Sequence, residues 1–255
     1  MNHKDLKEFL DEKLSRFNNS FFIKDDPISV PHLFFIKEDI EIAAFIASTL
    51  ACGQRPTIIS NSHKFLRIMG YKPFEFLSSA SKKDMEGFKH FTHRTFNGVD
   101  AVYFVKSLKN IYANYGGLEK VFFPENIKHH EIKNSLIRFR KVFFNGALPG
   151  RTGKHIADIE KKASAKRLNM FLRWMVRKDG MGVDFGLWKS ASPSILYCPL
   201  DIHSGTIARK LGLLHRKQND WQAVEELTAS LRKLDAKDPI KYDIALFGLG
   251  AIEKF

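Results

Sequence analysis

The sequence contains few cysteines. Only Cys52 and Cys198 occur among its 255 residues, and neither belongs to a CxxC pair. Two isolated thiols cannot build a disulfide framework, a structural zinc site or a four-cysteine iron–sulfur cluster. We therefore expect reduced thiols and no metal site.

Long apolar runs are also absent. No segment is long enough to cross a bilayer, and the first residues, MNHKDLKEFLDEKLSRF, lack an apolar core of signal-peptide length. We find no internal repeat, no low-complexity linker and no convincing strand pattern. These absences predict a soluble, cytoplasmic protein with no membrane partner.

Acidic residues are outnumbered. The chain has 28 Asp and Glu against 41 Lys and Arg, which gives a formal net charge of +13 and a pI near 9.6. A polyanion is the simplest partner for such a chain, although some basic proteins are basic for solubility alone. A chain of this length can bury a substantial core, as one domain or as two that share helices.

Apolar residues at helical spacing, together with helix-start and helix-stop residues, predict an all-α fold. Gly and Pro mark most of the expected boundaries, and Asp100 is expected to cap its helix. The helices are expected at residues 3–17, 38–52, 56–70, 100–115, 131–144, 166–177, 201–212 and 220–234, with a last one from 238.

The segment SAKRLNMFLRWMVR, residues 164–177, is the first of two motifs in the C-terminal half. On a helical wheel its apolar residues fall on one side, whereas Lys166, Arg173 and Arg177 fall almost opposite. This pattern predicts a buried stripe with a basic outer face.

The second motif is CPLDIHSGTIARKLG, residues 198–212. Asp201 follows Pro199 and precedes nine residues of helical pattern that Gly212 closes. We therefore expect Asp201 to be the N-cap of this helix, with its carboxylate at the positive helix end.

The run PLDIHSGTIARKLGLL resembles the segment of helix-hairpin-helix DNA glycosylases in which a catalytic aspartate opens a helix. With KRLNMFLRWMVR and DPIKYDIALFGLG, it also resembles an uncharacterised bacterial family over nearly the whole chain. The nearest enzymatic relatives of that family are the archaeal 8-oxoguanine DNA glycosylases. The resemblance implies one all-α unit, 1–255, with a helical lobe at about 38–145 and a second lobe from 1–37 plus 146–255.

A glycosylase that also cleaves the strand needs an amine to form a Schiff base with the sugar, and a carboxylate to stabilise the developing positive charge. The resemblance gives the carboxylate role to Asp201. Lys154 ends a glycine turn like the hairpin of the superfamily, but the turn has one residue too many and lies 47 residues before Asp201. Lys166 lies 35 residues before Asp201 and opens a helix, as the nucleophile does in the archaeal enzymes. We assign the nucleophile to Lys166 and keep Lys154 as the alternative.

The resemblance also implies contacts with DNA. Gln54, in the turn Gly53-Gln54-Arg55, matches the side chain that enters the duplex where the damaged nucleotide has left. The loop HFTHRTFNG brings His93, Arg94 and Asn97 together. The remaining expected DNA contacts are Arg55, Arg94, Arg173, Arg177, His203, Ser204 and Gly205, and the expected stacking residues for an extruded base are Trp174 and Trp188.

Each of these features also has a simpler interpretation. A charged helix face is usually only solvated, and a capping aspartate is often only structural. Most tryptophans belong to the core, a polar residue in an exposed turn needs no ligand, and His203 is typical of a local hydrogen-bonding residue. The catalytic interpretation therefore depends on Lys166 and Asp201 lying close together.

The resulting hypothesis is a monomeric DNA glycosylase with AP lyase activity that acts in base-excision repair. Its partner would be double-stranded DNA with a damaged base, with oxidised guanine as the substrate that the resemblance suggests, and it needs no metal or organic cofactor. The first alternative is a non-catalytic, helical nucleic-acid-binding protein. The second is a helical interaction module whose charge is incidental.

Overall fold

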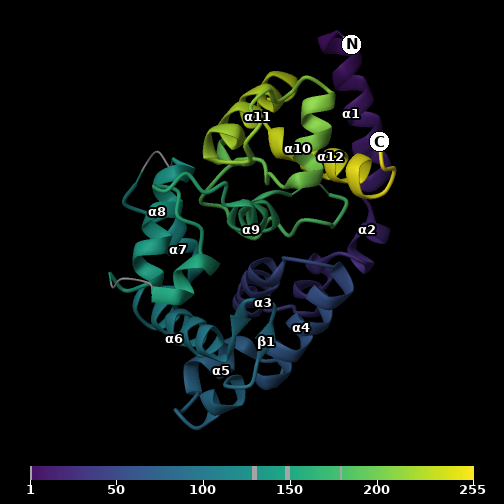
Figure 1. Ribbon diagram of the computed structural model, residues 1–255. Coiled ribbons are helices and arrows are strands. Elements are labelled where there is room, and N and C mark those ends of the chain that lie inside the picture. Colours follow the sequence, from purple (N-terminus) through teal and green to yellow (C-terminus); the bar gives the residue numbers. More distant parts are fainter. Residues whose placement is uncertain (1, 128–130, 147–149, 179) are drawn as a thin grey trace. The chain divides into compact units, whose positions relative to one another are not determined.

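A computed structural model describes residues 2–127, 131–146, 150–178 and 180–255, which form two compact units (Figure 1). Unit 1 comprises residues 1–22 and 158–255, and unit 2 comprises residues 23–157. The helical lobe expected at about 38–145 thus lies inside unit 2, and unit 1 combines the N-terminal helix with the C-terminal part of the chain. In the described parts of both units, no helix is both long and apolar enough to span a membrane.

The all-α expectation is confirmed, because helices make up most of the described chain. The expected helices are present, and their ends lie within two residues of the expected positions. The last one begins as a short 3₁₀ turn. Short elements that carry no clear periodicity, such as α5 (Pro73–Ser79) and α7 (Leu118–Phe122), were not expected.

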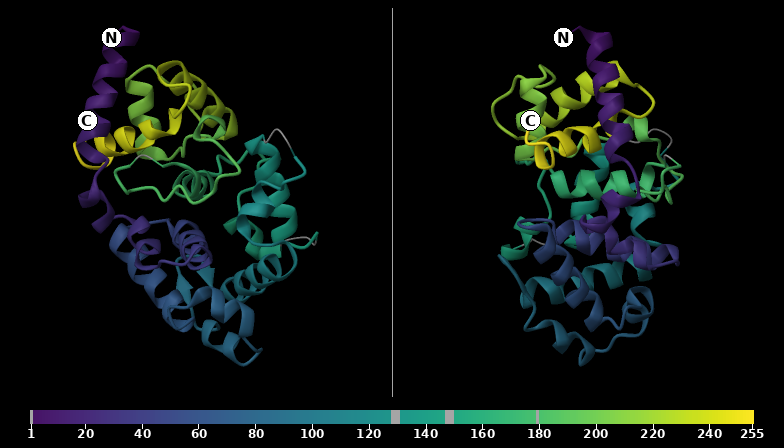
Figure 2. Two further views of the ribbon diagram at one scale, coloured as in Figure 1. Left: turned by 180° about the vertical axis from the view of Figure 1, so that it is seen from behind. Right: turned by 90° about the vertical axis from the view of Figure 1, so that its right-hand side faces the viewer.

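In unit 1, the helices of the C-terminal part lie side by side, and α1 packs along α12 (Figures 1 and 2). At their crossing, a Cβ on Gly248 would lie 2.1 Å from the ring of Phe17, so only glycine fits. The Tyr242 hydroxyl also donates a hydrogen bond of 3.0 Å to the Asp11 carboxylate. The elements of unit 1 are α1 (His3–Phe17), α9 (Lys166–Val176), η5 (Pro193–Ile195), α10 (Ile202–Lys210), α11 (Trp221–Leu234), η6 (Pro239–Lys241) and α12 (Tyr242–Ala251).

Helix α9 is the core helix of unit 1. Every residue from Leu168 to Val176 is buried, on the side with the arginine as well as on the apolar side. The chain that follows α9 folds back onto its last turn, where the Phe185 and Trp188 N–H groups donate to the Trp174 and Met175 carbonyls, both at 2.9 Å. A basic, solvent-facing side of α9 is therefore not present.

In unit 2, α3 occupies the centre, with every residue from Asp39 to Leu50 buried. The Phe45 ring lies 5.9, 5.5 and 5.8 Å from the rings of Phe104, Phe139 and Phe143, so that α3, α6 and α8 share one aromatic core. The chain enters through α2 (Ser20–Lys24). The further elements are η1 (Pro27–Ser29), η2 (Pro31–Leu33), α3 (Lys37–Leu50), α4 (Arg55–Ile68), α5, η3 (Asp84–Phe88), α6 (Gly98–Asn114), α7, α8 (Ile132–Phe143) and η4 (Gly150–His155).

Unit 2 also contains a small hairpin that the sequence did not predict. Strand β1 (Thr92–His93) pairs antiparallel with β2 (Phe96–Asn97). Two-residue strands are too short to show an alternating pattern, so their absence from the expectations has a simple cause. Asn97 then caps α6, and the expected cap, Asp100, is the third helical residue and completes a capping box with it.

Candidate functional site

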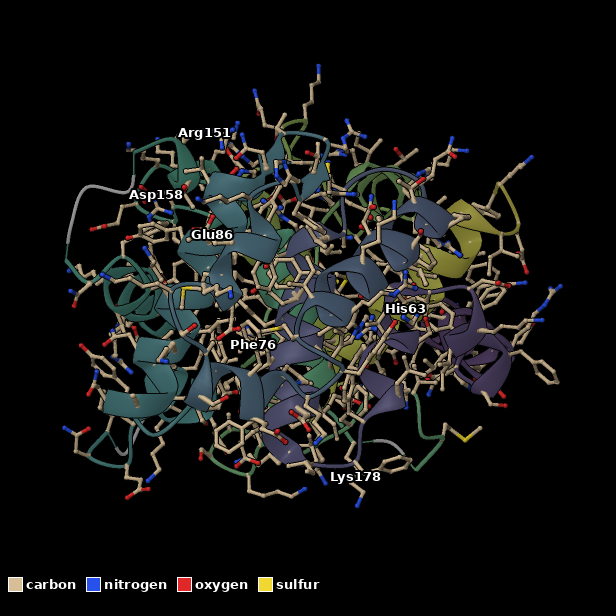
Figure 3. All side chains as sticks on the ribbon, turned by 90° about the horizontal axis from the view of Figure 1, so that it is seen from below. His63, Phe76, Glu86, Arg151, Asp158 and Lys178 are labelled. Atoms are coloured by element: carbon tan, nitrogen blue, oxygen red, sulfur yellow. The ribbon has the colours of Figure 1, made fainter. Side chains whose placement is uncertain are left out.

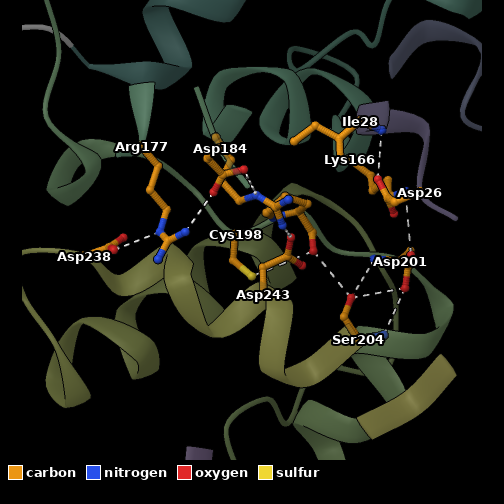
Figure 4. A network of polar contacts seen from close by, with 12 residues as sticks. Asp26, Ile28, Lys166, Arg177, Asp184, Cys198, Asp201, Ser204, Asp238 and Asp243 are labelled. Carbon is orange, nitrogen blue, oxygen red and sulfur yellow. Dashed lines mark hydrogen bonds and ion pairs between the residues drawn. The ribbon is translucent and has the colours of Figure 1, made fainter. Parts of the chain in front are cut away.

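Lys166 and Asp201 meet in unit 1 because each stands at the start of a helix. Lys166 is the first residue of α9 and Asp201 is the N-cap of α10. The Lys166 Nζ lies 3.8 Å from the Asp201 Oδ2, and the two side chains are 28% and 27% exposed (Figure 4). The expected convergence of the two residues is confirmed, and both remain accessible to solvent.

The N-cap fixes the orientation of the Asp201 carboxylate. Its Oδ1 accepts hydrogen bonds from the Ser204 N–H at 2.9 Å and from the Ser204 hydroxyl at 3.2 Å, while the Ser204 Oγ accepts from the Asp201 N–H at 3.0 Å. The Asn219 side chain donates to the Asp201 carbonyl at 3.1 Å. One carboxylate oxygen is thus used by the fold, and the other faces Lys166.

The same cap contradicts the DNA contacts that were expected for two residues in the first turn of α10. The Ser204 N–H is bound to the Asp201 side chain, and the Gly205 N–H donates to the Asp201 carbonyl at 3.0 Å. Both residues are buried, so the prediction that Ser204 and Gly205 contact DNA is wrong. His203, in the same turn, is exposed.

Arg173 and Arg177 are buried, with exposed fractions of 4% and 2%, and they belong to an ionic network inside unit 1. We call Arg173, Arg177, Asp184, Asp238 and Asp243 the buried arginine cluster. Asp184 bridges the two arginines, at 3.2 Å from Arg173 Nε and 2.9 Å from Arg177 Nη1. Arg177 Nε also pairs with Asp238 at 2.9 Å, and Arg173 pairs with Asp243 (Figure 4).

The expectation that Arg173 and Arg177 contact DNA is therefore wrong, and the reason is physical. A helical wheel separates apolar from charged residues, but it does not distinguish a face in water from a face covered by carboxylates. Here the covering aspartates come from the connector after α9 and from the region of α12. Buried arginines of this kind require such partners, because an unpaired buried charge is very costly.

Asp243 links the buried arginine cluster to the Lys166–Asp201 pair. Burial, helped by the negative charge of Asp201, raises the pKa of the Asp243 carboxyl to about 6 against the opposing effect of Arg173. The thiol of Cys198 lies in the same environment, where burial and then Asp243 raise its pKa well above the usual value. The Lys166–Asp201 pair thus lies beside a carboxyl group that titrates close to neutral pH.

The two tryptophans assigned to a base pocket belong to the core of unit 1. Trp174 is fully buried and Trp188 is 1% exposed, with its ring 5.3 Å from that of Phe171 in an edge-to-face arrangement. A side chain without exposed surface cannot stack on an extruded base unless the core opens. The stacking assignment of Trp174 and Trp188 is wrong in this structure.

Lys154, the alternative nucleophile, lies in η4 of unit 2 and is exposed. Residues 147–149 of the hairpin-like motif that precedes it lie outside the described residues. Its neighbour Arg151, which is labelled in Figure 3, donates to Asn97 Oδ1 and Asp100 Oδ2, both at 2.5 Å. These hydrogen bonds connect η4 to the start of α6.

Asp100, which the sequence predicted only as a helix cap, is the residue that Arg151 and Thr152 both contact. Its carboxylate is fully buried and accepts hydrogen bonds from the Asn97 N–H and the Thr152 hydroxyl, at 2.9 and 2.8 Å. Burial acts to raise the pKa of Asp100, but these hydrogen bonds and the charges of His155 and Arg151 hold it below the usual value. The Asn-x-x-Asp spacing of a capping box was the available signal.

The turn between α3 and α4 has the expected form. Helix α3 ends at Leu50, Gly53 has a positive φ of 113°, and Gln54 is the exposed N-cap of α4. In the described part of the chain, the Gln54 side chain makes no capping hydrogen bond. Arg55 is half-buried and lines a pocket of about 510 Å³ together with Asp25, Pro56, Ile59 and Ser60.

The hairpin of unit 2 lies against this turn. His93 contacts Cys52, and the guanidinium of Arg94 lies 3.0 Å from the point that a Cβ on Gly53 would occupy. Arg94 has a φ of 54° and is exposed. The structure therefore brings two expected DNA-contacting residues, Gln54 and Arg94, to one part of unit 2, although 40 residues separate them in the sequence.

No metal site is formed by the described residues, since no group of three His, Cys, Asp or Glu side chains is arranged to hold an ion.

We compared the chain with protein families, curated proteins and solved structures. A family model described as "Protein of unknown function (DUF2400)" matches residues 26–252. Neither the curated proteins nor the solved structures include a match.

Proposed function

The chain belongs to the DUF2400 family of proteins of unknown function, and from its site we propose that it is a DNA glycosylase with AP lyase activity. Lys166 is the proposed nucleophile and Asp201 the carboxylate that stabilises the developing charge. The activity goes beyond what the family match states.

The observation that carries the proposal is the 3.8 Å approach of Lys166 Nζ to Asp201 Oδ2 at two helix starts. A purely structural ion pair at the surface contributes little to stability, about 0–1 kcal/mol, and gives no reason for the additional order around Asp201. Here the capping box directs one oxygen toward the lysine, and the buried arginine cluster holds α9 in place. Such support is what a positioned catalytic pair requires.

The chemistry would proceed in two stages. The Lys166 amine forms a bond with C1′ of the damaged nucleotide as the bond from C1′ to the base breaks, and the base departs with the electron pair and takes up a proton. The negative charge of Asp201 stabilises the positive charge on the sugar in this step. Opening of the sugar ring, with transfer of a proton to O4′, then leaves a Schiff base on Nζ.

In the second stage the strand is cleaved. Loss of a proton from C2′ of the Schiff base drives elimination of the 3′ phosphate, which leaves with the electrons of the C3′–O bond. No redox step occurs, and none of these steps requires a cofactor. The proposed substrate is duplex DNA with an oxidised guanine, because the motifs around Lys166 and Asp201 resemble those of 8-oxoguanine glycosylases.

The test is trapping with borohydride, which reduces the Schiff base to a stable covalent complex. The wild-type protein is incubated with duplexes that carry 8-oxoguanine, an abasic site or no lesion. We expect a covalent complex with the first two duplexes and none after Lys166→Ala, whereas Lys161→Ala, at an exposed lysine nearby, retains it. Trapping that survives Lys166→Ala and disappears with Lys154→Ala would move the nucleophile to unit 2.

Asp201→Asn separates the charge of this residue from its capping role. Asparagine caps helices about as well as aspartate, so the fold of α10 should persist. Removal of the negative charge should slow release of the base by about a hundredfold or more. Excision at the wild-type rate in a folded Asp201→Asn protein would contradict the proposed role.

A second candidate function is non-catalytic nucleic-acid binding, and the charge of unit 2 favours it. Unit 2 has 20 Lys and Arg against 12 Asp and Glu, so it carries a net +8 of the total +13. A protein of this kind would bind undamaged and damaged DNA equally, lose affinity steeply with salt and form no trapped complex. No measurable DNA affinity even at low salt would exclude both functions.

A further inference from the structure

The two ring nitrogens of His93 each make a hydrogen bond to a different segment of unit 2. Its Nδ1 lies 2.9 Å from the Asn61 Nδ2, and its Nε2 lies 3.2 Å from the Cys52 carbonyl oxygen. The amide nitrogen is a donor and the carbonyl oxygen can only accept. With the amide nitrogen as donor, Nδ1 accepts and the N–H on Nε2 donates to the carbonyl, so the ring connects α4 to the turn that precedes it.

The position of His93 gives this connection its importance. The imidazole is 4% exposed, and it comes from the hairpin, 41 residues beyond the carbonyl that it binds. The side chain of the next residue, Arg94, packs against Gly53. Within the described structure, the Gln54 side chain makes no capping hydrogen bond. Its position therefore depends on the backbone of the turn.

We infer that His93 is a positioning residue, which holds the Cys52–Gln54 turn against the hairpin so that Gln54 and Arg94 form one DNA-contacting surface. This inference rests on the proposed function, in which Gln54 enters the duplex after the damaged nucleotide has left the stack. His93 itself touches neither DNA nor the reacting atoms. Its effect is to keep Gln54 and Arg94 in a fixed position relative to each other.

Two substitutions separate the two hydrogen bonds of His93. The amide nitrogen of glutamine reaches the Nε2 position and can donate to the Cys52 carbonyl, whereas the shorter asparagine reaches only the Nδ1 position near Asn61. His93→Gln therefore keeps the bond to the turn and His93→Asn loses it. Both variants retain a polar amide in a buried place, which makes them a matched pair.

The experiment measures excision of 8-oxoguanine from a duplex, trapping on an abasic site in single-stranded DNA, and amide hydrogen exchange at residues 51–55. We expect His93→Asn to slow excision by about tenfold and to speed exchange in the turn. Trapping on the single strand should be unchanged, because no base has to be displaced there. His93→Gln should stay within about twofold of wild type in all three.

Excision by His93→Asn at the wild-type rate, or an equal loss on both substrates, would overturn the inference. If His93→Asn does not fold, His93→Gln alone decides: slowed excision from the duplex, although the bond to the Cys52 carbonyl is kept, would overturn the inference. If the wild-type protein traps nothing, the proposed function fails by itself. The role of His93 is then decided by duplex affinity and hydrogen exchange, and equal values for the Asn and Gln variants would reject it.

Discussion

At the start of α10, in unit 1, the N-cap side chain of Asp201 accepts two hydrogen bonds from Ser204 and faces Lys166. At the start of α4, in unit 2, the N-cap side chain of Gln54 is exposed and makes no capping bond in the described structure. The hydrogen bonds of the cap hold the Asp201 side chain in one orientation. The Gln54 side chain, in contrast, does not take part in capping its helix. Chemistry needs the first arrangement, whereas insertion between bases needs the second.

The difference continues into the surroundings of each site. Behind Lys166 and Asp201 lies the buried arginine cluster, in which both arginines and Asp184 are almost entirely removed from water. Behind Gln54 lies a turn that one histidine connects to a short hairpin. On the proposed function, we therefore expect substitutions in the buried arginine cluster to change stability and activity together, and substitution of Gln54 to change DNA processing alone.

Arg173→Ala should have the largest effect on stability. It leaves Asp243 without its arginine partner and removes one of the two arginines that bind Asp184. Breaking a buried pair from one side costs about 3–5 kcal/mol. Denaturant unfolding should show this loss, whereas Arg67→Ala, on the exposed face of α4, should change stability by less than about 0.5 kcal/mol. Equal costs would show that the cluster is not important for holding α9.

The pH dependence of stability should show the titration of the Asp243 carboxyl. Its pKa is raised from 3.8 to about 6, mainly by burial, so the folded protein retains a proton that the unfolded chain releases. The stabilisation from that proton is complete below about pH 4 and is lost as the pH rises through 6, by roughly 2–3 kcal/mol at most. Asp243→Asn cannot titrate at this position, so its stability relative to wild type should rise between pH 4 and 7. A constant difference across this range would contradict the shift.

Two substitutions of Asp201 should differ in stability by about 1 kcal/mol. Asp201→Ala removes the cap, whereas Asp201→Asn preserves it, and loss of an aspartate N-cap typically costs about 1 kcal/mol. Both variants should lose excision activity because both lose the charge. Thermal unfolding combined with the excision assay measures the two effects separately. If Asp201→Ala were as stable as the wild type, the capping box would not be needed for the fold.

Gln54→Ala should have the smallest effect on stability, within about 0.5 kcal/mol, because the exposed side chain makes no capping bond. On the proposed function it should still reduce excision from duplex DNA, while trapping on a single-stranded abasic site remains at the wild-type level. A marked fall in melting temperature would contradict the contrast between the two helix starts.

Much of the helical framework could be predicted from the sequence, because helices of more than three turns repeat their apolar residues several times. Helices α1, α3 and α11 are examples. The hairpin at residues 92–97 could not be predicted, since its strands are two residues long. The partners of Arg173 and Arg177 were not predictable either, because Asp243 lies 70 residues from Arg173 and only the tertiary fold brings them together.

The candidate site, too, could be predicted only where local residues or the resemblance determine it. The Asp201 cap followed from local residues, and its closeness to Lys166 followed from the resemblance and is confirmed by the structure. Trp174, Trp188 and both arginines are buried because other segments of unit 1 pack around α9. The sequence of α9 alone does not show which segments these are. The loop that holds His93 was expected to contact DNA, but no local signal indicated the bond from His93 to the distant Cys52 carbonyl.

The contact between α1 and α12 also affects the order in which the protein can assemble during synthesis. Asp11 and Tyr242 are 231 residues apart, and unit 2 lies between them as one continuous segment. Unit 2 can therefore fold on the ribosome while α1, already outside the exit tunnel, still exposes the apolar side chains of Leu6, Leu10 and Phe17. Unit 1 is completed only after α12 has left the exit tunnel, so a nascent chain halted before α12 has no finished partner for α1.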